Sequence, residues 1–149
     1  MLREIAELES GRVLLTGGPK RLARIYLNAW IRRGKAVLAE YLPFQVEGEV
    51  VIGSPFESGD FDVYLIVNPI SKSSVEKEML YTWLSKHSNR LVLLYESKYI
   101  ADSITRYRIR QFVDYLIAYK RETVGFERIE AMRLKGGKVI GRKTYVRRR

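Results

Sequence analysis

Two uninterrupted apolar runs constrain the fold of this chain more than any other feature of its sequence. Residues 62–67 read DVYLIV and residues 90–95 read RLVLLY, without the polar alternation of a half-solvated strand. Strands of this kind are covered on both faces, as in a parallel sheet with helices on either side. The stretch between them predicts a helix, because Ser73 and Glu76 fit a capping box. The predicted apolar stripe of this helix consists of Val75, Met79, Leu80, Trp83 and Leu84.

The preceding segments show the same alternation of strands and helices. Residues 12–16 predict a strand that ends at a Gly-Gly-Pro turn, and a helical pattern then runs to Gly34. Residues 35–41 predict a second buried strand, and residues 49–52 form a short apolar run. The apolar face of the helix is predicted to consist of Leu22, Ile25, Tyr26, Ala29 and Trp30.

The last third of the chain predicts antiparallel strands. Residues 97–113 fit a loop, a helix or a strand, whereas 115–119, 127–134 and 138–146 read as strands. Two glycines, Gly136 and Gly137, separate the last two strands and are a strong hairpin signal. A chain of 149 residues fits one domain, residues 1–149. The predicted fold class is α/β, with a mainly parallel sheet flanked by helices and a C-terminal antiparallel hairpin.

The composition excludes several kinds of site. The chain has no cysteine and a single histidine, His87, which argues against disulfides, thiol nucleophiles, iron–sulfur clusters and multi-histidine metal sites. No apolar run approaches the roughly 20 residues that span a bilayer, and the charged N-terminus is unlike a signal peptide. We therefore expect a soluble, cytoplasmic protein. The scarcity of Asn, Gln and Cys favours a thermophilic source.

The net charge of +10 is confined to one part of the chain. Residues 1–97 hold 12 basic and 12 acidic side chains, whereas residues 98–149 hold 15 basic and 5 acidic ones. This distribution argues against a uniformly basic, disordered chain. It predicts a balanced globular body with one electropositive face, the usual footprint of a protein that binds a polyanion.

Three stretches of the sequence resemble the RecA-like ATPase superfamily, particularly its KaiC/RadA branch. Residues 12–41 resemble the first strand, phosphate loop, long helix and second strand of the family. Residues 60–97 resemble the Walker B strand, the next helix and the sensor strand, and residues 114–148 resemble the terminal antiparallel strands. The resemblance implies a three-layer fold of the P-loop NTPase type, and it implies DNA recombination or repair as the setting.

The sequence departs from this family where ATP chemistry requires particular residues. The phosphate loop G-x-x-x-x-G-K-[ST] is shortened to residues 17–21, where Arg21 replaces the hydroxyl residue. The Walker B strand ends in the neutral Asn68 instead of a carboxylate. Pro43 and Phe44 occupy the place of the catalytic glutamate, and Glu40 is a poor substitute. We therefore predict a RecA-like protein without ATPase activity and without a cofactor.

A vestigial phosphate site is an alternative for the glycine turn. Gly17, Gly18 and Lys20 precede and begin a predicted helix, where backbone N–H groups and a lysine could meet a phosphate. The competing interpretation is a tight strand-to-helix turn with no ligand. The shortened loop favours the tight turn.

The family resemblance also points to a DNA-binding segment. In RecA-like recombinases a loop after the sensor strand contacts single-stranded DNA, and residues 97–110 hold that place here. Cations interleaved with aromatic side chains suit a single strand, because phosphates meet the cations and bases stack on the rings. The predicted contacts are Lys98, Tyr99, Arg106, Tyr107, Arg108 and Arg110, together with Arg142, Lys143, Arg147 and Arg148 in the terminal hairpin. The alternatives are solvated arginines with buried tyrosines in the segment, and charges that merely protect a sheet edge in the hairpin.

Three functions fit these observations. The first is a non-catalytic accessory protein that binds DNA, preferentially single-stranded, beside an active RecA/RadA-like recombinase. The second is a magnesium-dependent nuclease of the PD-(D/E)xK type, with Asp62 or Asp60 and Glu96 as metal ligands and Lys98 steadying the attacking water. The third is an inactive RecA-like scaffold that binds a protein partner. The first agrees best with the basic third of the chain and with the degenerate ATP motifs.

Overall fold

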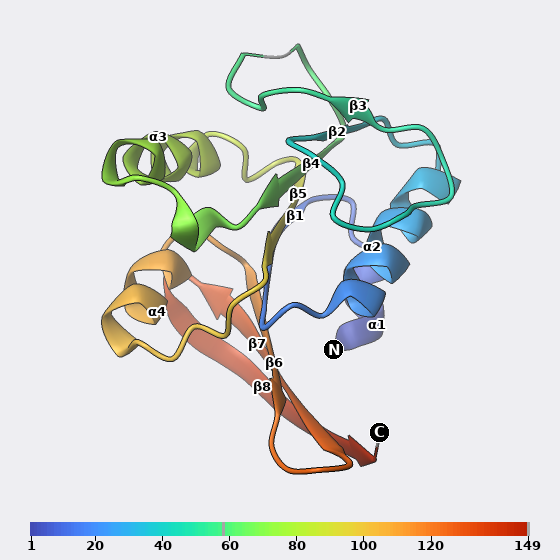
Figure 1. Cartoon of the computed structure of the whole chain (residues 1–149). Coiled ribbons are helices and arrows are strands. Elements are labelled where there is room, and N and C mark those ends of the chain that lie inside the picture. Colours follow the sequence, from blue (N-terminus) through green and yellow to red (C-terminus); the bar gives the residue numbers. More distant parts are fainter. Residues whose placement is uncertain (58, 149) are drawn as a thin grey trace.

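The computed structural model describes residues 1–57 and 59–148, so that Ser58 and Arg149 lie outside the described part. Within it the strands form one 8-stranded sheet in the order β3-β2-β4-β5-β1-β6-β7-β8 (Figure 1). The strands are β1 (Gly11–Thr16), β2 (Val37–Ala39), β3 (Val51–Ile52), β4 (Val63–Val67), β5 (Leu91–Glu96), β6 (Tyr115–Arg121), β7 (Phe126–Lys135) and β8 (Lys138–Arg148). The helices are α1 (Leu2–Ala6), α2 (Lys20–Arg32), α3 (Ser74–Ser85) and α4 (Ser103–Arg110), with a 3₁₀ turn, η1, at Pro69–Ser71.

The sheet is mixed, and its parallel part comes first in the chain. Strands β3, β2, β4, β5, β1 and β6 pair in parallel, and β7 and β8 then add antiparallel strands beyond β6. The mainly parallel α/β sheet and its C-terminal antiparallel hairpin are thus confirmed. The two edges differ in length, because β3 has 2 residues and β8 has 11.

Helices cover both faces of the sheet (Figure 1). On one face, α1 and α2 pack over a cluster that includes Val13, Leu15 and Trp30. On the other face, α3 and α4 pack over a cluster that includes Leu14 and Leu84. Successive residues of a strand point to opposite faces, so a strand with apolar residues at every position supplies both clusters. This explains the uninterrupted apolar runs at β4 and β5.

Helix α2 buries a face that is shifted by one residue from the predicted stripe. The buried side chains are Ala23, Tyr26, Leu27 and Trp30, and Ile25 is half exposed. The short helix α1 sets this orientation, because the Tyr26 hydroxyl donates to the Leu2 carbonyl at 2.9 Å and the Trp30 indole N–H donates to the Ile5 carbonyl at 3.3 Å. Burial raises the pKa of the Tyr26 phenol, so it remains a proton donor.

Helix α3 begins at the predicted capping box but buries a different stripe. The Ser73 hydroxyl accepts from the Glu76 N–H at 3.2 Å, and the Ser73 N–H donates to the Glu76 carboxylate at 3.4 Å. The predicted stripe was wrong at its start, since Val75 and Met79 are 71% and 50% exposed. Instead Tyr81 is buried and stacks on Phe112 with ring centroids 4.6 Å apart. That stacking rotates the helix away from its first two apolar residues.

The ambiguous segment 97–113 contains helix α4. Its N-cap is Asp102, whose carboxylate accepts from the Thr105 hydroxyl at 2.5 Å and from the Thr105 N–H at 2.9 Å. These two hydrogen bonds hold the pKa of Asp102 below its usual value. The predicted hairpin turn is confirmed, because β7 and β8 flank Gly136 and Gly137, which both have positive φ.

In the described part of the chain, no helix is both long and apolar enough to cross a membrane.

Candidate nucleic-acid interface

The glycine turn after β1 is shaped by the chain's own backbone. The Gly17 N–H donates to the Lys98 carbonyl at 3.0 Å, and the Gly18 N–H donates to the Glu96 carbonyl at 3.0 Å. Both residues have positive φ, and a Cβ at Gly17 would overlap the carbonyl oxygen of Tyr119. Two N–H groups that a phosphate loop would offer to its ligand are therefore already bonded. The geometry fits the tight turn better than a phosphate cradle.

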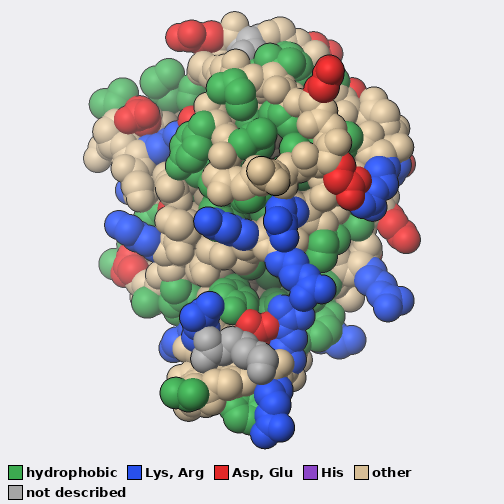
Figure 2. All heavy atoms as spheres, turned by 45° about the vertical axis from the view of Figure 1, so that its right-hand side comes forward, with side chains coloured by type: hydrophobic (Ala, Val, Ile, Leu, Met, Phe, Trp, Pro, Cys, Tyr) green, Lys and Arg blue, Asp and Glu red, His purple; other side chains and the backbone are tan. Residues whose placement is uncertain are grey.

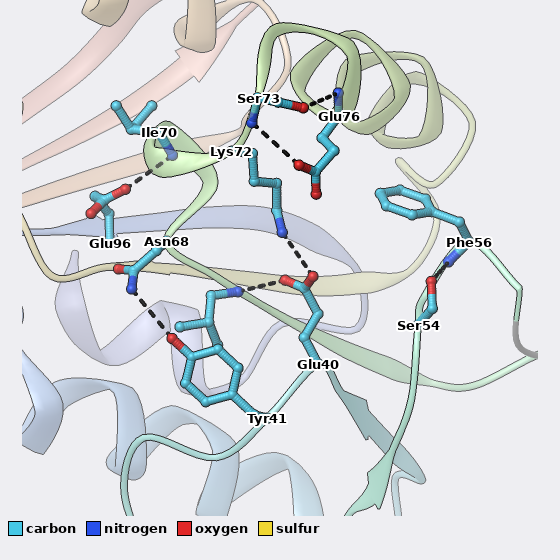
Figure 3. A network of polar contacts seen from close by, with 11 residues as sticks. Glu40, Tyr41, Ser54, Phe56, Asn68, Ile70, Lys72, Ser73, Glu76 and Glu96 are labelled. Carbon is cyan, nitrogen blue, oxygen red and sulfur yellow. Dashed lines mark hydrogen bonds and ion pairs between the residues drawn. The ribbon is translucent and has the colours of Figure 1, made fainter.

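The positions expected for magnesium and water chemistry hold structural contacts instead (Figure 3). One Glu40 carboxylate oxygen accepts from the Val67 N–H at 2.9 Å, and the other pairs with Lys72 at 2.8 Å. Asn68 adopts the left-handed conformation, and its side-chain oxygen accepts from the N–H and hydroxyl of Ser97, both at 2.9 Å. These contacts tie together the carboxyl ends of β2, β4 and β5, and they leave neither side chain free to hold a metal or polarise water.

Glu96 is completely buried at the end of β5 and also serves a structural role. One carboxylate oxygen accepts from the Ile70 N–H at 3.0 Å (Figure 3). The other accepts from the Lys98 N–H, also at 3.0 Å. The Thr16 hydroxyl donates to the Lys98 carbonyl at 2.6 Å and accepts from the Ile100 N–H. The chain after β5 is thereby fixed against the end of β1.

The residues of the nuclease alternative do not come together. Because Val63 pairs with Leu91, Asp62 lies level with Arg90, which is six residues before Glu96 along β5. Six strand residues span about 20 Å, so the two carboxylates cannot share one metal ion. Asp62 instead accepts from the Ala36 N–H at 2.8 Å, and the exposed Asp60 pairs with Arg90 at 2.9 Å. No group of three or more His, Asp or Glu side chains suited to a metal occurs among residues 1–57 and 59–148.

The segment 97–110 does not present the predicted row of free cations. Arg106 donates to the Ile100 carbonyl and lies 5.0 Å from the Tyr99 ring centre. Arg108 pairs with Glu78 of α3, and Arg110 donates to the Gly137 carbonyl at 3.1 Å. These three arginines bind α4 to its surroundings. Lys98 and Tyr107 are exposed.

The four predicted cations of β8 divide between the two faces of the sheet. Lys143 pairs with Ala131, and Arg147 pairs with Glu127, which places both on the α1/α2 face. Arg142 pairs with Met132, so it lies on the α3/α4 face together with Arg148. Residues 98–110 and the hairpin cations therefore do not form the single DNA-binding surface that the sequence suggested.

A different set of cations does gather on one surface. Two adjoining hollows, of about 390 Å³ and about 500 Å³, lie beside helix α2 and share Arg21 and Ile25. Figure 2 shows Lys and Arg side chains following one another down this side of the molecule and onto the hairpin. We call this set the α2–hairpin surface, and it consists of Lys20, Arg21, Arg24, Arg121 and Arg147.

Most of these cations have no acidic partner. Lys20, Arg21, Arg24 and Arg121 are exposed, and within the described residues none of them forms an ion pair or a side-chain hydrogen bond. The exception is Arg147, which pairs with the buried carboxylate of Glu127. Unpaired cations on a concave surface attract an anion without first breaking an internal contact.

Of the residues on this surface, only Lys20 and Arg147 were predicted from the sequence as binding residues, and Arg21, Arg24 and Arg121 were not. A signal was present for two of them, since Arg21 and Arg24 lie one turn apart on the polar side of the α2 pattern. Arg121 has a weaker signal, which is its alternation with Tyr119 and Ile117 along β6. Nothing local to the sequence shows that α2 and β6 lie beside each other.

Comparisons with known proteins bear on the fold alone. No protein-family model and no curated protein sequence matches the chain. The structure is similar to the crystal structure of the N-terminal domain of zonular occludens toxin from Neisseria meningitidis, with a TM-score of 0.53. The two chains are 9% identical, and the superposition covers 93% of this chain and 94% of that domain. The similarity therefore supports a shared mixed α/β architecture.

Proposed function

We propose that this protein is a non-catalytic, RecA-like accessory protein that binds single-stranded DNA on its α2–hairpin surface. The observation that carries the proposal is the row of four unpaired cations across two adjoining hollows, from Arg24 and Arg21 to Lys20 and Arg121. Recombination or repair is the setting that the resemblance to RecA-like proteins implies.

The topology supports the RecA-like part of the proposal. Strand β1 leads through a glycine turn into α2, a capped helix separates β4 from β5, and antiparallel strands end the chain. This is the order that the resemblance implies for the first strand, the Walker B region and the terminal strands. The similarity to the zonular occludens toxin domain agrees with the sheet architecture and carries no function to this chain.

The hydrogen bonds of the glycine turn support the absence of ATP hydrolysis. ATP chemistry needs free N–H groups around the phosphates and a hydroxyl and a carboxylate for magnesium. Here the Gly17 and Gly18 N–H groups bond to carbonyls, Arg21 replaces the hydroxyl residue, and Asn68 replaces the carboxylate. The protein would bind DNA without a nucleotide cofactor.

A single strand suits this surface better than a duplex. Phosphates attract cations whatever the sequence, and counterion release makes that attraction strongly dependent on salt. The cations lie in two hollows, which a flexible strand can enter. A duplex is stiff over about 150 base pairs and would bridge such hollows.

Salt-dependent binding of a fluorescent oligothymidylate tests the proposal. We expect log Kd to depend linearly on log salt concentration, with a slope near 3 for about four neutralised phosphates. The double variant Arg21→Gln/Arg24→Gln should lower that slope by about 1.4. A matched variant, Lys86→Gln/Lys135→Gln, removes the same charge far from the surface and should leave the slope unchanged.

Two results would reject the proposal. One is the absence of binding at low salt, and the other is an equal loss of affinity in the two double variants, which would indicate attraction by net charge alone. A duplex of the same length serves as the second ligand, and tighter binding to it would overturn the preference for a single strand. The recombinase partner stays a prediction, which co-purification with the full chain would test.

A further inference from the structure

The cavity at the hairpin end of the α2–hairpin surface differs from the rest of that surface. Four cationic side chains from three elements line it: Lys20 and Arg21 from α2, Arg121 from β6 and Arg147 from β8. Its volume of about 390 Å³ falls within the range of small-molecule sites. The neighbouring hollow is more open and is lined by cations from α2 alone. The two hollows therefore present different surroundings to a phosphate.

A row of three charged residues, one each from β6, β7 and β8, forms part of the lining of this cavity. Glu127 of β7 pairs in register with Arg121 of β6 on one side and with Arg147 of β8 on the other. Directly opposed residues on one face have Cβ atoms about 5 Å apart, so the two arginines flank the carboxylate. Glu127 is only 7% exposed and also accepts the Tyr119 hydroxyl at 2.6 Å. The carboxylate is thus held away from solvent while Arg121 stays exposed.

The charges of the cavity leave a positive excess for a ligand. Four cations and one carboxylate line it, and that carboxylate is bonded to Arg147 and Tyr119. A phosphomonoester carries about −1.5 to −2 charges at pH 7, whereas a phosphodiester inside a strand carries one. Several cations that line one cavity therefore favour the terminal phosphate over the phosphates within a strand.

The remaining lining suits the nucleoside that bears such a phosphate. Leu22 and Ile25 of α2 and Ile129 of β7 supply apolar walls beside the cations. A nucleotide presents the same combination, with a charged phosphate at one end and a flat, weakly polar base at the other. A bare inorganic anion would use only the charged part.

We propose that this cavity receives the phosphorylated end of the DNA strand. The inference rests on the proposed function and adds a polarity to it: the strand runs from the terminal phosphate in the cavity to the open hollow beside Arg24. The open hollow binds phosphodiesters within the strand, and the cavity binds the terminal phosphate. The protein would thus be a binder of strand ends.

Paired oligothymidylates test the inference. The two strands have the same length and carry the fluorophore at the 3′ end, and they differ only in a hydroxyl or a phosphate at the 5′ end. A second pair, labelled at the 5′ end, carries a hydroxyl or a phosphate at the 3′ end. We expect the end phosphate to tighten binding about tenfold, the gain from one charge-assisted hydrogen bond.

Variants locate the source of the preference. Arg121→Gln should make the affinities for the phosphorylated and the hydroxyl strand equal. Arg24 lies outside the cavity, so Arg24→Gln should lower both affinities by the same factor and preserve their ratio. Both side chains are exposed and unpaired within the described part of the chain, so thermal unfolding should be unchanged. A variant with a folding defect would show a lower melting temperature.

Several results would overturn the assignment. These are equal affinity for hydroxyl and phosphate ends, a ratio that survives Arg121→Gln, or displacement of the phosphorylated strand by thymidine monophosphate as effectively as by the unlabelled strand. The last result would identify a free mononucleotide as the ligand. If neither strand binds at low salt, the proposed function fails together with the inference, whereas equal binding of both ends removes the inference alone.

Discussion

Gly17 lies so close to the carbonyl oxygen of Tyr119 that no other residue fits at its position. A Cβ there would overlap this oxygen, and the φ of +92° is one that only glycine adopts readily. The contact joins the turn after β1 to strand β6, which follows it in the sheet but lies about 100 residues later in the chain. The glycine pair is therefore explained by packing of one backbone against another.

This contact predicts a large loss of stability in Gly17→Ala. Backbone strain and overlap with a backbone atom should together cost about 3–5 kcal/mol, and thermal unfolding should begin at least about 10 °C lower. The matched control is Gly59→Ala, because a Cβ at Gly59 meets nothing within 4 Å. Similar melting temperatures for Gly17→Ala and the native chain would contradict the close packing.

The glycine turn also predicts that the protein does not hydrolyse ATP. Incubation with ATP and magnesium should release no phosphate above the buffer blank, because the N–H groups of Gly17 and Gly18 are already bonded. The double variant Arg21→Thr/Asn68→Asp restores two residue types of the family motif but leaves these bonds in place. We expect it to remain inactive. Magnesium-dependent phosphate release by the native chain would contradict the prediction that the protein does not hydrolyse ATP.

Glu96 is predicted to act on stability alone. An amide at this position can accept at one oxygen only, so Glu96→Gln would leave one of two buried N–H groups unpaired and cost about 1–3 kcal/mol. Urea unfolding measures this loss, and Glu57→Gln, at an exposed position, is the control. Neither the native chain nor the variant should cut DNA with magnesium. Cleavage that Glu96→Gln abolishes would revive the nuclease alternative.

The cap of α3 predicts a pH-dependent effect on stability. The hydrogen bonds from Ser73 hold the pKa of Glu76 below its usual value of 4.5. Stability from this ionised carboxylate is therefore present above pH 4.5 and is lost as pH falls through the lower pKa of the folded state. Ser73→Ala should cost about 1 kcal/mol at pH 7 and less at acid pH. NMR titration should show the Glu76 pKa returning towards 4.5.

A neighbouring serine supplies the control for this prediction. Ser74 begins α3 but makes no capping contact, so Ser74→Ala should leave both the stability and the Glu76 pKa unchanged. An unaltered Glu76 pKa in Ser73→Ala would show that the cap does not set it.

Much of the fold followed from local sequence signals. The apolar runs at β4 and β5 required cover on both faces, Ser73 and Glu76 located the start of α3, and Gly136 and Gly137 marked the hairpin. The errors arose where a distant contact chose between similar patterns. Tyr81 turned α3 by stacking on Phe112, and α1 turned α2 through hydrogen bonds to Tyr26 and Trp30.

The candidate surface was harder to predict than the fold. The composition located the excess charge in residues 98–149, but it could not tell which arginines were already paired. Arg108 is neutralised by Glu78, which is 30 residues away in the chain, and Arg110 is bonded to the hairpin turn. The unpaired cations of α2 lie in the electrically balanced part of the chain. They lie next to the hairpin only because the sheet places β6, β7 and β8 beside β1, the strand that leads into α2.

The unequal edges of the sheet have a consequence for assembly. Strand β3 offers 2 residues to an incoming strand, too few to direct pairing, whereas β8 offers 11. Yet β8 contains five cations and no acidic residue, so two copies aligned edge to edge would set like charges against one another. The positive charge of β8 thus opposes growth of the sheet by addition of a second copy at this edge.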